Sequence, residues 1–458
     1  MKKTFLLLIL LPAFCYGQLP YTENLYETRV ETDVAYGEAI NYAGQSESLE
    51  LDIYKPIGDS NCKRPCLVLV HGGAWIGGSK DDLNIANIAQ HYAEKGWVVA
   101  TINYRLGTHK IPSYDMYLFC NEDISAPCGY VADSAEVIRA NYRGQQDAKG
   151  AIRFMKNRSG LDSIDVNNVF IAGESAGGFV SYAATFMQTN SEKPSFCGAI
   201  ANAPTPDADL LDCLPVGFSL TRPDLGDVQG DLNLGTHDAS VQGIGNIYGA
   251  MFDFDMLADE TEWPVVYQFH QGSDVVVNYD YGRVLGRMDW ECYTPTNLCQ
   301  NYARYPRAFG SKGIETYFAS LVDGPERVSE IIENYEYSND CFDNGHSIDN
   351  WVTRSNNMAN LFATRIEDNG NTPTTGPCFA SLTSEEIGLV AYPNPSTGLI
   401  TLSPTGNEIM NVTIFSSNGS IVKNFNMNSS TEINLLPGIY LLKTSSSANY
   451  SVQKLVVL

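Results

Sequence analysis

The ten residues 169–178, VFIAGESAGG, constrain this chain more than any other segment. The run 169–172 is apolar and favours β structure, which predicts a buried strand. Gly173 and Gly177 then bracket Ser175 at the spacing G-x-S-x-G. A serine presented on a sharp turn from a strand into a helix needs such neighbours, because a side chain at either flanking position would collide with the turn. The segment therefore predicts a strand, a tight turn that exposes Ser175, and a helix whose N-terminus faces the hydroxyl.

A second glycine-rich turn lies upstream of this serine. The apolar run CLVLV predicts another buried strand, and the motif HGGAW at 71–75 follows it directly. Backbone N–H groups in such a turn can point at one place and stabilise the oxyanion of a tetrahedral intermediate. We expect Gly73 and Ala74 to supply two of these donors, with Gly72 as the alternative. Ala176, directly after the serine, is expected to supply another.

An acid and a base follow downstream, each on a turn. Asp274 comes after the strand-like run 265–269, and His346 lies in the turn NGHSID before an amphipathic helical stretch. The chain order Ser175, Asp274, His346 differs from the orders of the two main serine protease folds. His270 is the alternative base. Its place on the same strand end as Asp274 favours a local hydrogen bond that shapes the acid's loop.

The two glycine motifs resemble those of the α/β-hydrolase esterases. They look like HGG(G/A)W and GESAGG of that family, and they are most similar to the bacterial carboxylesterases that include acetyl and feruloyl esterases of polysaccharide breakdown. The resemblance spans residues 45–366, and LELDIYKP at 49–56 is similar to that group's first hairpin. It implies an α/β fold, with Ser175 as nucleophile, His346 as general base and then acid, and Asp274 as the residue that orients the imidazole.

We expect the chain to consist of four consecutive segments. Residues 1–17 are typical of a signal peptide, because a basic start precedes a short apolar run and a small residue at the cleavage point. Residues 18–367 are expected to form the catalytic domain, with a mainly parallel sheet and helices on both faces. Residues 368–387 are typical of a linker, and residues 388–458 predict a small all-β sandwich.

Strands and helices are expected to alternate within the catalytic domain. Two long stretches, 205–262 and 279–341, are expected to be inserts on the catalytic face that form lids or substrate walls. Aromatic residues of the second insert could stack on a sugar or an aryl group, or could simply pack the insert; they are Trp290, Tyr293, Tyr302 and Tyr305. The strands are expected near 67–70, 97–103, 168–172, 198–202 and 265–269, and the helices at 84–95, 144–157 and 177–187.

The segment after the linker has three landmarks in order. They are YPNPSTG at 392–398, PGIYL at 437–441 and the ending KLVVL at 454–458. Together they resemble the C-terminal sorting domain of type IX secretion cargo in Bacteroidetes. The resemblance implies that residues 388–458 engage the type IX secretion machinery and that the enzyme is secreted or attached to the cell surface. A carbohydrate-binding module is the alternative interpretation.

Ten cysteines remain besides Cys15, an even number that suits disulfide bonds in an exported chain. The sequence does not fix their connectivity, and some could be free thiols. Pairing of near neighbours is our hypothesis, and it gives Cys62/Cys66, Cys120/Cys128, Cys197/Cys213, Cys292/Cys299 and Cys341/Cys378.

Composition and motifs limit which classes of ligand and partner we expect the chain to bind. The formal net charge of −24 argues against nucleic acid and anionic membranes as partners. No cluster with metal-ligand spacing and no nucleotide-binding glycine loop is present, so we expect no metal and no cofactor. An acidic loop at Asp207, Asp209 and Asp212 could hold a structural cation, although a solvated loop is the favoured interpretation. Beyond the signal peptide, no segment approaches the ~20 apolar residues of a transmembrane helix.

These patterns predict a secreted serine carboxylic-ester hydrolase. We expect it to act on short-acyl or aryl esters, of a polysaccharide or a polyester, through an acyl-enzyme. One alternative is a serine peptidase of the prolyl oligopeptidase type, which usually carries a large N-terminal domain that the 44 or so leading residues are too few to build. Another is an esterase-like binding protein without catalysis, although such proteins commonly lose the nucleophile or the base.

Overall fold

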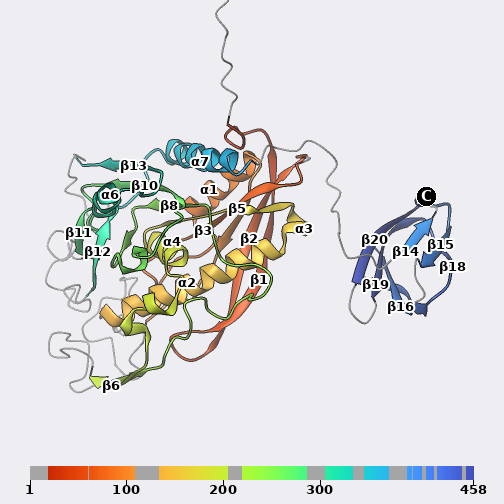
Figure 1. Cartoon of the computed structure of the whole chain (residues 1–458), viewed down its shortest axis with the longest axis horizontal. Helices are drawn as coiled ribbons and strands as arrows, with labels where there is room; N and C mark the ends of the chain where they lie inside the picture. Colours follow the sequence, from red (N-terminus) through yellow and green to blue (C-terminus); the bar gives the residue numbers. More distant parts are fainter. Residues whose placement is uncertain are drawn as a thin grey trace, which may run out of the picture. The chain divides into compact units, whose positions relative to one another are not determined.

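The structure is a computed structural model of the chain (Figure 1), which divides into two compact units, Met1–Cys378 and Phe379–Leu458. Each unit is described by itself. The expected signal peptide and most of the expected linker lie outside the described residues. The structure describes residues 19–59, 61–108, 134–204, 219–285, 305–333, 345–370, 389–392, 394, 396–404, 409–416, 420–445 and 450–458.

An eight-stranded sheet forms the centre of the first unit, with the strand order β1-β2-β4-β3-β5-β8-β10-β13. β1 and β2 run antiparallel to each other, and β2 runs antiparallel to β4, whereas all pairs from β4 to β13 are parallel. The expected mainly parallel sheet is therefore confirmed. The strands are β1 (Glu27–Ile40), β2 (Ser46–Ile57), β3 (Arg64–Val70), β4 (Val98–Ile102), β5 (Ile164–Glu174), β8 (Gly243–Ile247), β10 (Val265–Gln271) and β13 (Arg327–Ile332).

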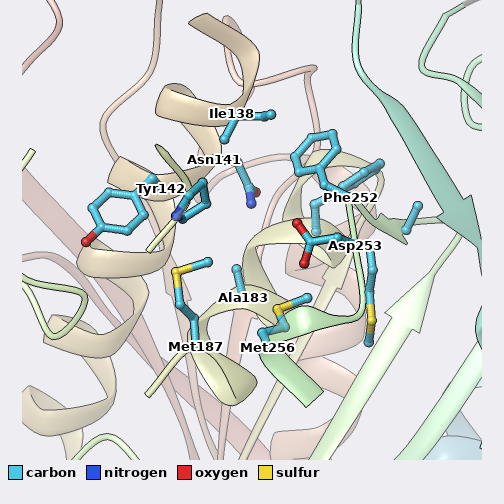
Figure 2. A pocket seen from close by; sticks show the side chains of 12 residues that line it. Ile138, Asn141, Tyr142, Ala183, Met187, Phe252, Asp253 and Met256 are labelled. Carbon is cyan, nitrogen blue, oxygen red and sulfur yellow. The ribbon is translucent and has the colours of Figure 1, made fainter. Parts of the chain in front are cut away.

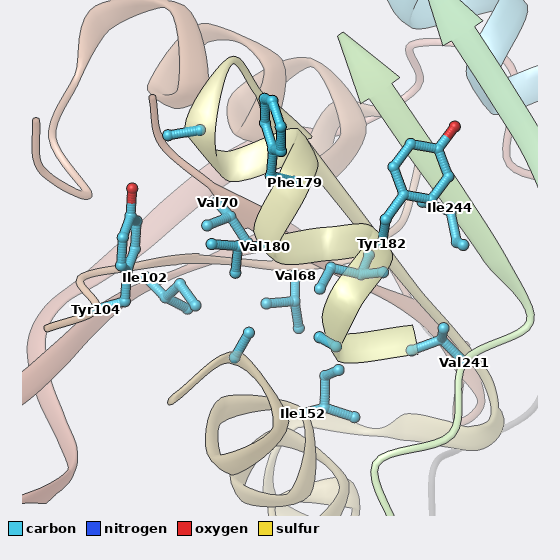
Figure 3. Close-up of a cluster of buried hydrophobic side chains, with 14 of the residues drawn as sticks. Val68, Val70, Ile102, Tyr104, Ile152, Phe179, Val180, Tyr182, Val241 and Ile244 are labelled. Atoms are coloured by element: carbon cyan, nitrogen blue, oxygen red, sulfur yellow. The ribbon is translucent and has the colours of Figure 1, made fainter. Parts of the chain in front are cut away.

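Helices cover both faces of this sheet, because its central strands are apolar on both faces. In β3, Val68 and Val70 pack in one cluster with Ile152 of α2 and Phe179 of α4 (Figure 3). The alternate residues of the same strand pack in a second cluster, which holds residues of α1 and α7. The helices of this unit are α1 (Leu83–Glu94), α2 (Ser134–Asn157), α3 (Ser159–Asp162), α4 (Ala176–Phe186), α6 (Ser311–Ser320) and α7 (Trp351–Asp368), with the short 3-10 helices η2 (Asn190–Glu192), η3 (Ser195–Cys197) and η5 (Asp255–Leu257).

One expected strand is not part of the main sheet. The segment expected at 198–202 forms β6 (Ile200–Pro204), which pairs antiparallel with β7 (Ser219–Arg222) in a separate two-stranded sheet. The strand beside β5 in the main sheet is β8, which comes from the stretch 205–262. That stretch is therefore not a simple insert, because it supplies a central strand of the core.

The glycines of β8 explain why the sequence pattern did not reveal it. A Cβ on Gly243 would lie 2.8 Å from the Phe170 ring, and a Cβ on Gly245 would lie 2.2 Å from Met358 Sδ. Neighbouring side chains fill the space that a side chain in this strand would need, so GIGNI lacks the apolar texture of a buried strand. The strand is nevertheless buried along its whole length.

The stretch 279–341 also contains regular structure rather than only a lid. It provides β13, which closes the edge of the main sheet next to β10, and α6. It also contributes two of the three strands of a small sheet with the order β11-β12-β9. Tyr305 is buried, whereas the other three aromatic residues singled out in this stretch lie outside the described residues. The three strands are β9 (Ala250–Met251), β11 (Tyr281–Arg283) and β12 (Arg307–Gly310).

The second unit consists of two antiparallel sheets around one apolar core. The sheets have the orders β14-β15-β18 and β17-β16-β19-β20. Buried and exposed residues alternate along β19, so Tyr440 and Leu442 face the core. The strands are β14 (Leu389–Tyr392), β15 (Leu399–Pro404), β16 (Met410–Ser416), β17 (Ile421–Met427), β18 (Thr431–Asn434), β19 (Gly438–Ser445) and β20 (Tyr450–Val457).

The hypothesis of near-neighbour disulfides fails at two pairs. Cys66 and Cys197 are buried free thiols, so the pairs Cys62/Cys66 and Cys197/Cys213 are wrong. Cys66 lies inside β3, where its side chain packs as a small apolar group. Cys62 itself is disulfide-bonded. The other three expected pairs lie outside the described residues.

Candidate active site

Ser175 lies on the sharp turn between β5 and α4, in a backbone conformation that non-glycine residues rarely adopt. Its φ is 52° and its ψ is −123°. A Cβ on Gly173 would lie 2.3 Å from the carbonyl of Gly177, and a Cβ on Gly177 would lie 2.2 Å from the carbonyl oxygen of Val70. Both positions therefore exclude a side chain, as the G-x-S-x-G spacing indicates.

The structure brings Ser175, His346 and Asp274 together from three distant parts of the chain. His346 Nε2 lies 2.9 Å from Ser175 Oγ, and His346 Nδ1 lies 2.8 Å from Asp274 Oδ2. Because the carboxylate accepts from Nδ1, that nitrogen carries the proton and Nε2 presents its lone pair to the serine hydroxyl. This arrangement can remove the proton from Ser175 as its oxygen attacks an electrophile.

Gly345 allows the loop that carries His346 to approach the loop that carries Asp274. Its φ is +78°, in the left-handed region. A Cβ at this position would lie 2.2 Å from Ser273 Oγ and 2.9 Å from the backbone nitrogen of Asp274. The glycine before the histidine is thus required by both conformation and space.

Asp274 is completely buried and is held by hydrogen bonds on both oxygens. Oδ1 accepts the backbone N–H groups of Val276 and Val277 at 2.8 and 2.9 Å. Oδ2 accepts from His346 and also lies 3.1 Å from Nε2 of His270. Burial alone would raise the pKa of Asp274, but the two imidazoles lower it below its ordinary value, so the carboxylate is ionised.

His270 is fully buried, and among the described residues its ring bonds to Asp274, Val277 and Ser311. The base that faces Ser175 is His346. The place of His270 agrees with the expected local hydrogen bond in the acid's loop.

A tyrosine that the sequence analysis did not single out packs on the imidazole of His346. The ring of Tyr248 lies 4.7 Å from that imidazole, centroid to centroid, and its hydroxyl donates to Glu174 Oε2 at 2.7 Å. Burial raises the pKa of Glu174, which stands directly before the serine. Through Tyr248, Glu174 supports the face of the imidazole.

The turn expected to hold an oxyanion lies directly against the serine. A Cβ on Gly72 would lie 3.1 Å from Ser175 Cβ, and three consecutive residues after it have positive φ: 102° at Gly73, 52° at Ala74 and 61° at Trp75. Within the described part of the chain, the N–H groups of Gly73 and Ala74 have no hydrogen-bond acceptor. They remain available to a ligand.

Two further groups complete this region. Ala176 is the first residue of α4, where a helix leaves its N–H groups without an intrahelical acceptor. His71 stacks on Tyr104, with ring centroids 4.5 Å apart, and its Nδ1 lies 2.7 Å from the carbonyl oxygen of Gly72. His71 therefore supports the turn through the Gly72 carbonyl group and by packing on Tyr104.

A largely apolar pocket is lined mainly by side chains of α2, of α4 and of residues 250–256 (Figure 2). Its cavity volume is about 40 Å³. The Phe179 ring lines this pocket and contacts Trp75 of the glycine turn, 5.1 Å away between centroids. Phe179 is one helical turn beyond Ser175, so the pocket begins close to the serine. The lining residues are Ile138, Asn141, Tyr142, Phe179, Ala183, Met187, Pro194, Ala250, Met251, Phe252, Asp253 and Met256.

No group of three or more His, Cys, Asp or Glu side chains that could hold a metal ion occurs among the described residues. The acidic loop at Asp207, Asp209 and Asp212 lies outside them. The described helices also include none with the length and hydropathy of a membrane span.

Two family models match separate parts of the chain. Residues 51–143 match the BD-FAE esterase family, and residues 390–458 match the secretion system C-terminal sorting domain. The first match includes the glycine turn at 71–75, and the second spans nearly all of the second unit. The sorting domain marks the chain for export to the cell surface or the medium. The strand order and the serine turn after β5 are those of the α/β-hydrolase fold.

Curated relatives match shorter stretches. Bile salt-activated lipase from Homo sapiens is 30% identical over 155 residues, which are 32% of this chain and 17% of the lipase. Gut esterase 1 from Caenorhabditis elegans is 29% identical over 30% of this chain and 20% of the esterase. Isoprenylcysteine alpha-carbonyl methylesterase from Arabidopsis thaliana is 25% identical over 40% of this chain and 34% of that enzyme. The chain thus spans only about a third or less of these relatives' length.

Similar solved structures also include esterases. Esterase B from Lactobacillus rhamnosis has a TM-score of 0.41 at 12% identity, covering 76% of this chain and 89% of that chain. A truncated carbohydrate esterase from gut microbiota has a TM-score of 0.39 at 15% identity, covering 76% of this chain and 99% of that chain.

Proposed function

We propose that this exported chain hydrolyses carboxylic esters through an acyl-enzyme on Ser175. The observation that carries the proposal is the geometry of the serine turn, with Ser175 Oγ 2.9 Å from an imidazole that is itself bonded to the buried carboxylate of Asp274. The match of residues 51–143 to an esterase family supports it. The names of the relatives, a lipase and several esterases, favour the same reaction class.

In the acylation step, His346 takes the proton of Ser175 while Oγ attacks the ester carbonyl carbon. The carbonyl oxygen becomes an oxyanion, which the N–H groups of Gly73, Ala74 and Ala176 stabilise by about 3 kcal/mol per donor. His346 then gives its proton to the leaving alcohol as the carbon–oxygen bond breaks. The alcohol departs, and the acyl group stays on Ser175.

In the deacylation step, the same groups act on water. His346 removes a proton from a water molecule, which attacks the acyl carbon and regenerates the oxyanion. Collapse of that intermediate breaks the bond to Ser175, and His346 returns the proton to Oγ. The carboxylic acid leaves, and the ionised Asp274 stabilises the imidazolium in both steps. The proposed steps use only these side chains, the backbone N–H groups and water.

The substrate is proposed to be a short-acyl or aryl ester. The pocket along α4 supports this, because aromatic and methionine side chains line it and it begins one turn beyond the serine. Export of the chain favours an external ester, such as an acylated polysaccharide or a polyester. Filling the pocket with Ala183→Trp is expected to lower kcat/KM for the octanoate ester more than for the acetate ester, because only the longer chain needs the space.

The test is hydrolysis of p-nitrophenyl acetate, butyrate and octanoate by the full chain. We expect cleavage of the short esters, and its loss in Ser175→Ala and in His346→Ala. The matched control is His91→Ala, which removes an imidazole outside the site, one bonded to Asn24 and Asn356. Absence of ester cleavage by folded wild-type protein would refute the proposal. Turnover of a prolyl peptide substrate instead would favour the peptidase alternative, and no reaction with a covalent serine probe would favour the binding protein.

A further inference from the structure

A chain of buried hydrogen bonds leads from Asp274 into the core, beyond the residues used in the proposed reaction. His270, on β10, approaches Asp274 Oδ2 through Nε2 at 3.1 Å, and its Nδ1 lies 3.0 Å from Ser311 Oγ. Asn246, on β8, donates its side-chain N–H to the same Ser311 oxygen at 3.1 Å. All four side chains belong to residues that are fully buried. Bulk water therefore does not compete for these bonds, which makes their geometry specific.

The surroundings of His270 determine which ring nitrogen carries the proton. Nε2 faces two acceptors, Asp274 Oδ2 and the carbonyl oxygen of Val277 at 3.0 Å, so it must be the N–H. Nδ1 faces the backbone N–H of Ser311 at 3.4 Å, at the N-terminus of α6, so it must be the acceptor. The Ser311 hydroxyl accepts from Asn246 and therefore donates to Nδ1. Every donor in this series of hydrogen bonds thus has an acceptor.

We propose that His270 is a positioning residue for the acid of the active site: its Nε2–H holds Asp274 Oδ2 in place while His346 exchanges protons with Ser175 and the leaving group. The inference rests on the proposed function for its kinetic consequence. Oδ2 is the oxygen that His346 uses, whereas Oδ1 is held by two backbone N–H groups. His270 gives Oδ2 a second N–H donor. This donor takes no part in the proton transfer between His346 and Ser175. Ser311 fixes the tautomer that makes this donation possible.

Two substitutions at His270 separate positioning from packing. In His270→Gln the side-chain N–H can occupy the place of Nε2 and still donate to Asp274, but the contact with Ser311 is lost. In His270→Asn the shorter side chain reaches only the place of Nδ1, so the contact with Ser311 can remain while the donor to Asp274 is lost. Both variants replace a buried imidazole with a smaller amide. His91→Gln and His91→Asn are the matched controls, because His91 is also buried and hydrogen-bonded through both nitrogens.

The readouts are kcat and KM for p-nitrophenyl butyrate with the full chain, together with Tm. Loss of one hydrogen bond to a charged group is expected to lower kcat about tenfold in His270→Asn. KM should change less than about twofold, because His270 does not touch the substrate. His270→Gln should keep kcat within about threefold of wild type, and both His91 variants should keep it unchanged. Equal losses of kcat in His270→Gln and His270→Asn, or a change confined to KM, would overturn the proposal.

A second measurement uses only the wild-type chain. It therefore does not depend on whether a variant folds or whether a test ester is cleaved. In the full wild-type chain labelled with ¹⁵N at histidine, the ring resonances of His270, assigned through contact with the amide proton of Ser311, report its tautomer. The proposal predicts a proton on Nε2 and a bare Nδ1. A proton on Nδ1 with a bare Nε2 would overturn it, because Asp274 would then receive no donor from this ring. Failure of the wild type to cleave any test ester refutes the proposed function and leaves this result interpretable.

Discussion

Gly345→Ala tests whether the loop before His346 must pass close to Asp274. Two costs follow from the structure. The first is conformational, because alanine at a φ of +78° is in the left-handed region, at a cost of about 1 kcal/mol. The second is steric, because the new Cβ would lie 2.2 Å from Ser273 Oγ and 2.9 Å from the backbone nitrogen of Asp274. The Ser273 hydroxyl can rotate away, but the backbone of Asp274 cannot.

The magnitude follows from the distance that must open. An ordinary contact of a Cβ begins near 3.4 Å, so the loop and the Asp274 backbone must separate by 0.5 Å, the difference between 3.4 and 2.9 Å. Since a 1 Å misplacement of reacting groups costs about a hundredfold in rate, half of that displacement should cost about tenfold in kcat. KM should change little, because the substrate contacts are untouched.

The assay is steady-state hydrolysis of p-nitrophenyl butyrate together with urea unfolding. Gly44→Ala is the matched control, because Gly44 has a φ of +76° and no atom within 4 Å of its added Cβ. Gly44→Ala should lose about 1 kcal/mol of stability and no activity. Adding Ser273→Ala to Gly345→Ala should leave kcat equally low, since the contact with the backbone nitrogen of Asp274 remains. A kcat for Gly345→Ala within twofold of that for Gly44→Ala would show that the close approach does not matter for the reaction.

Three further predictions concern the acid, the tyrosine and pH. Asp274→Asn presents an amide N–H to His346 and forces the wrong tautomer, so kcat for p-nitrophenyl butyrate should fall about 10⁴-fold with little change in KM; retention of a tenth of the activity would contradict this. Tyr248→Phe leaves the buried Glu174 without its hydroxyl donor, and urea unfolding should show a loss of about 1–3 kcal/mol, with equal stability as the refuting result. Burial raises the pKa of Glu260 to about 7, above the ordinary value of 4.5. The folded protein therefore favours the protonated carboxyl group. The stability that this form contributes is present below pH 4.5 and is lost as the pH rises through 7. Glu260→Gln should therefore raise Tm by roughly 2 °C at pH 8 and leave it unchanged at pH 4, and an equal effect at both values would exclude this cause.

Local sequence patterns predict the parts of the site whose conformation depends on steric contacts between residues close together in the sequence. The glycines around Ser175 have no room for a side chain, and the same constraint gives G-x-S-x-G its spacing. Asp274 and His346 each follow a local turn signal, and the structure brings both to the serine. The mainly parallel sheet follows from the alternation of apolar strands with helices.

The parts that the sequence did not reveal depend on contacts between distant segments. β8 is hidden because Gly243 and Gly245 leave space for the side chains of Phe170 and Met358, so its own residues carry no apolar pattern. Its position beside β5 makes the stretch 205–262 part of the core rather than a lid.

The supporting side chains of the site are equally non-local. Ser311 reaches His270 only because α6 begins beside β10, and no motif marks either Ser311 or Asn246. Tyr248 follows the unrecognised strand β8, so its contact with His346 could not be anticipated. Free Cys66 shows the same limit: spacing suggested a bridge to Cys62, but the side chain faces the core of the sheet.

The most direct test of the account is the site of covalent labelling by a phosphate triester, diethyl p-nitrophenyl phosphate, whose transferred group stays on a nucleophilic serine. Peptide mass spectrometry of the full chain should show one diethylphosphoryl group, on the peptide that contains Ser175, and esterase activity should fall in proportion to the labelled fraction. The Ser175→Ala variant should remain unlabelled. Labelling at another residue, or full activity after complete labelling of Ser175, would contradict the claim that this serine is the nucleophile.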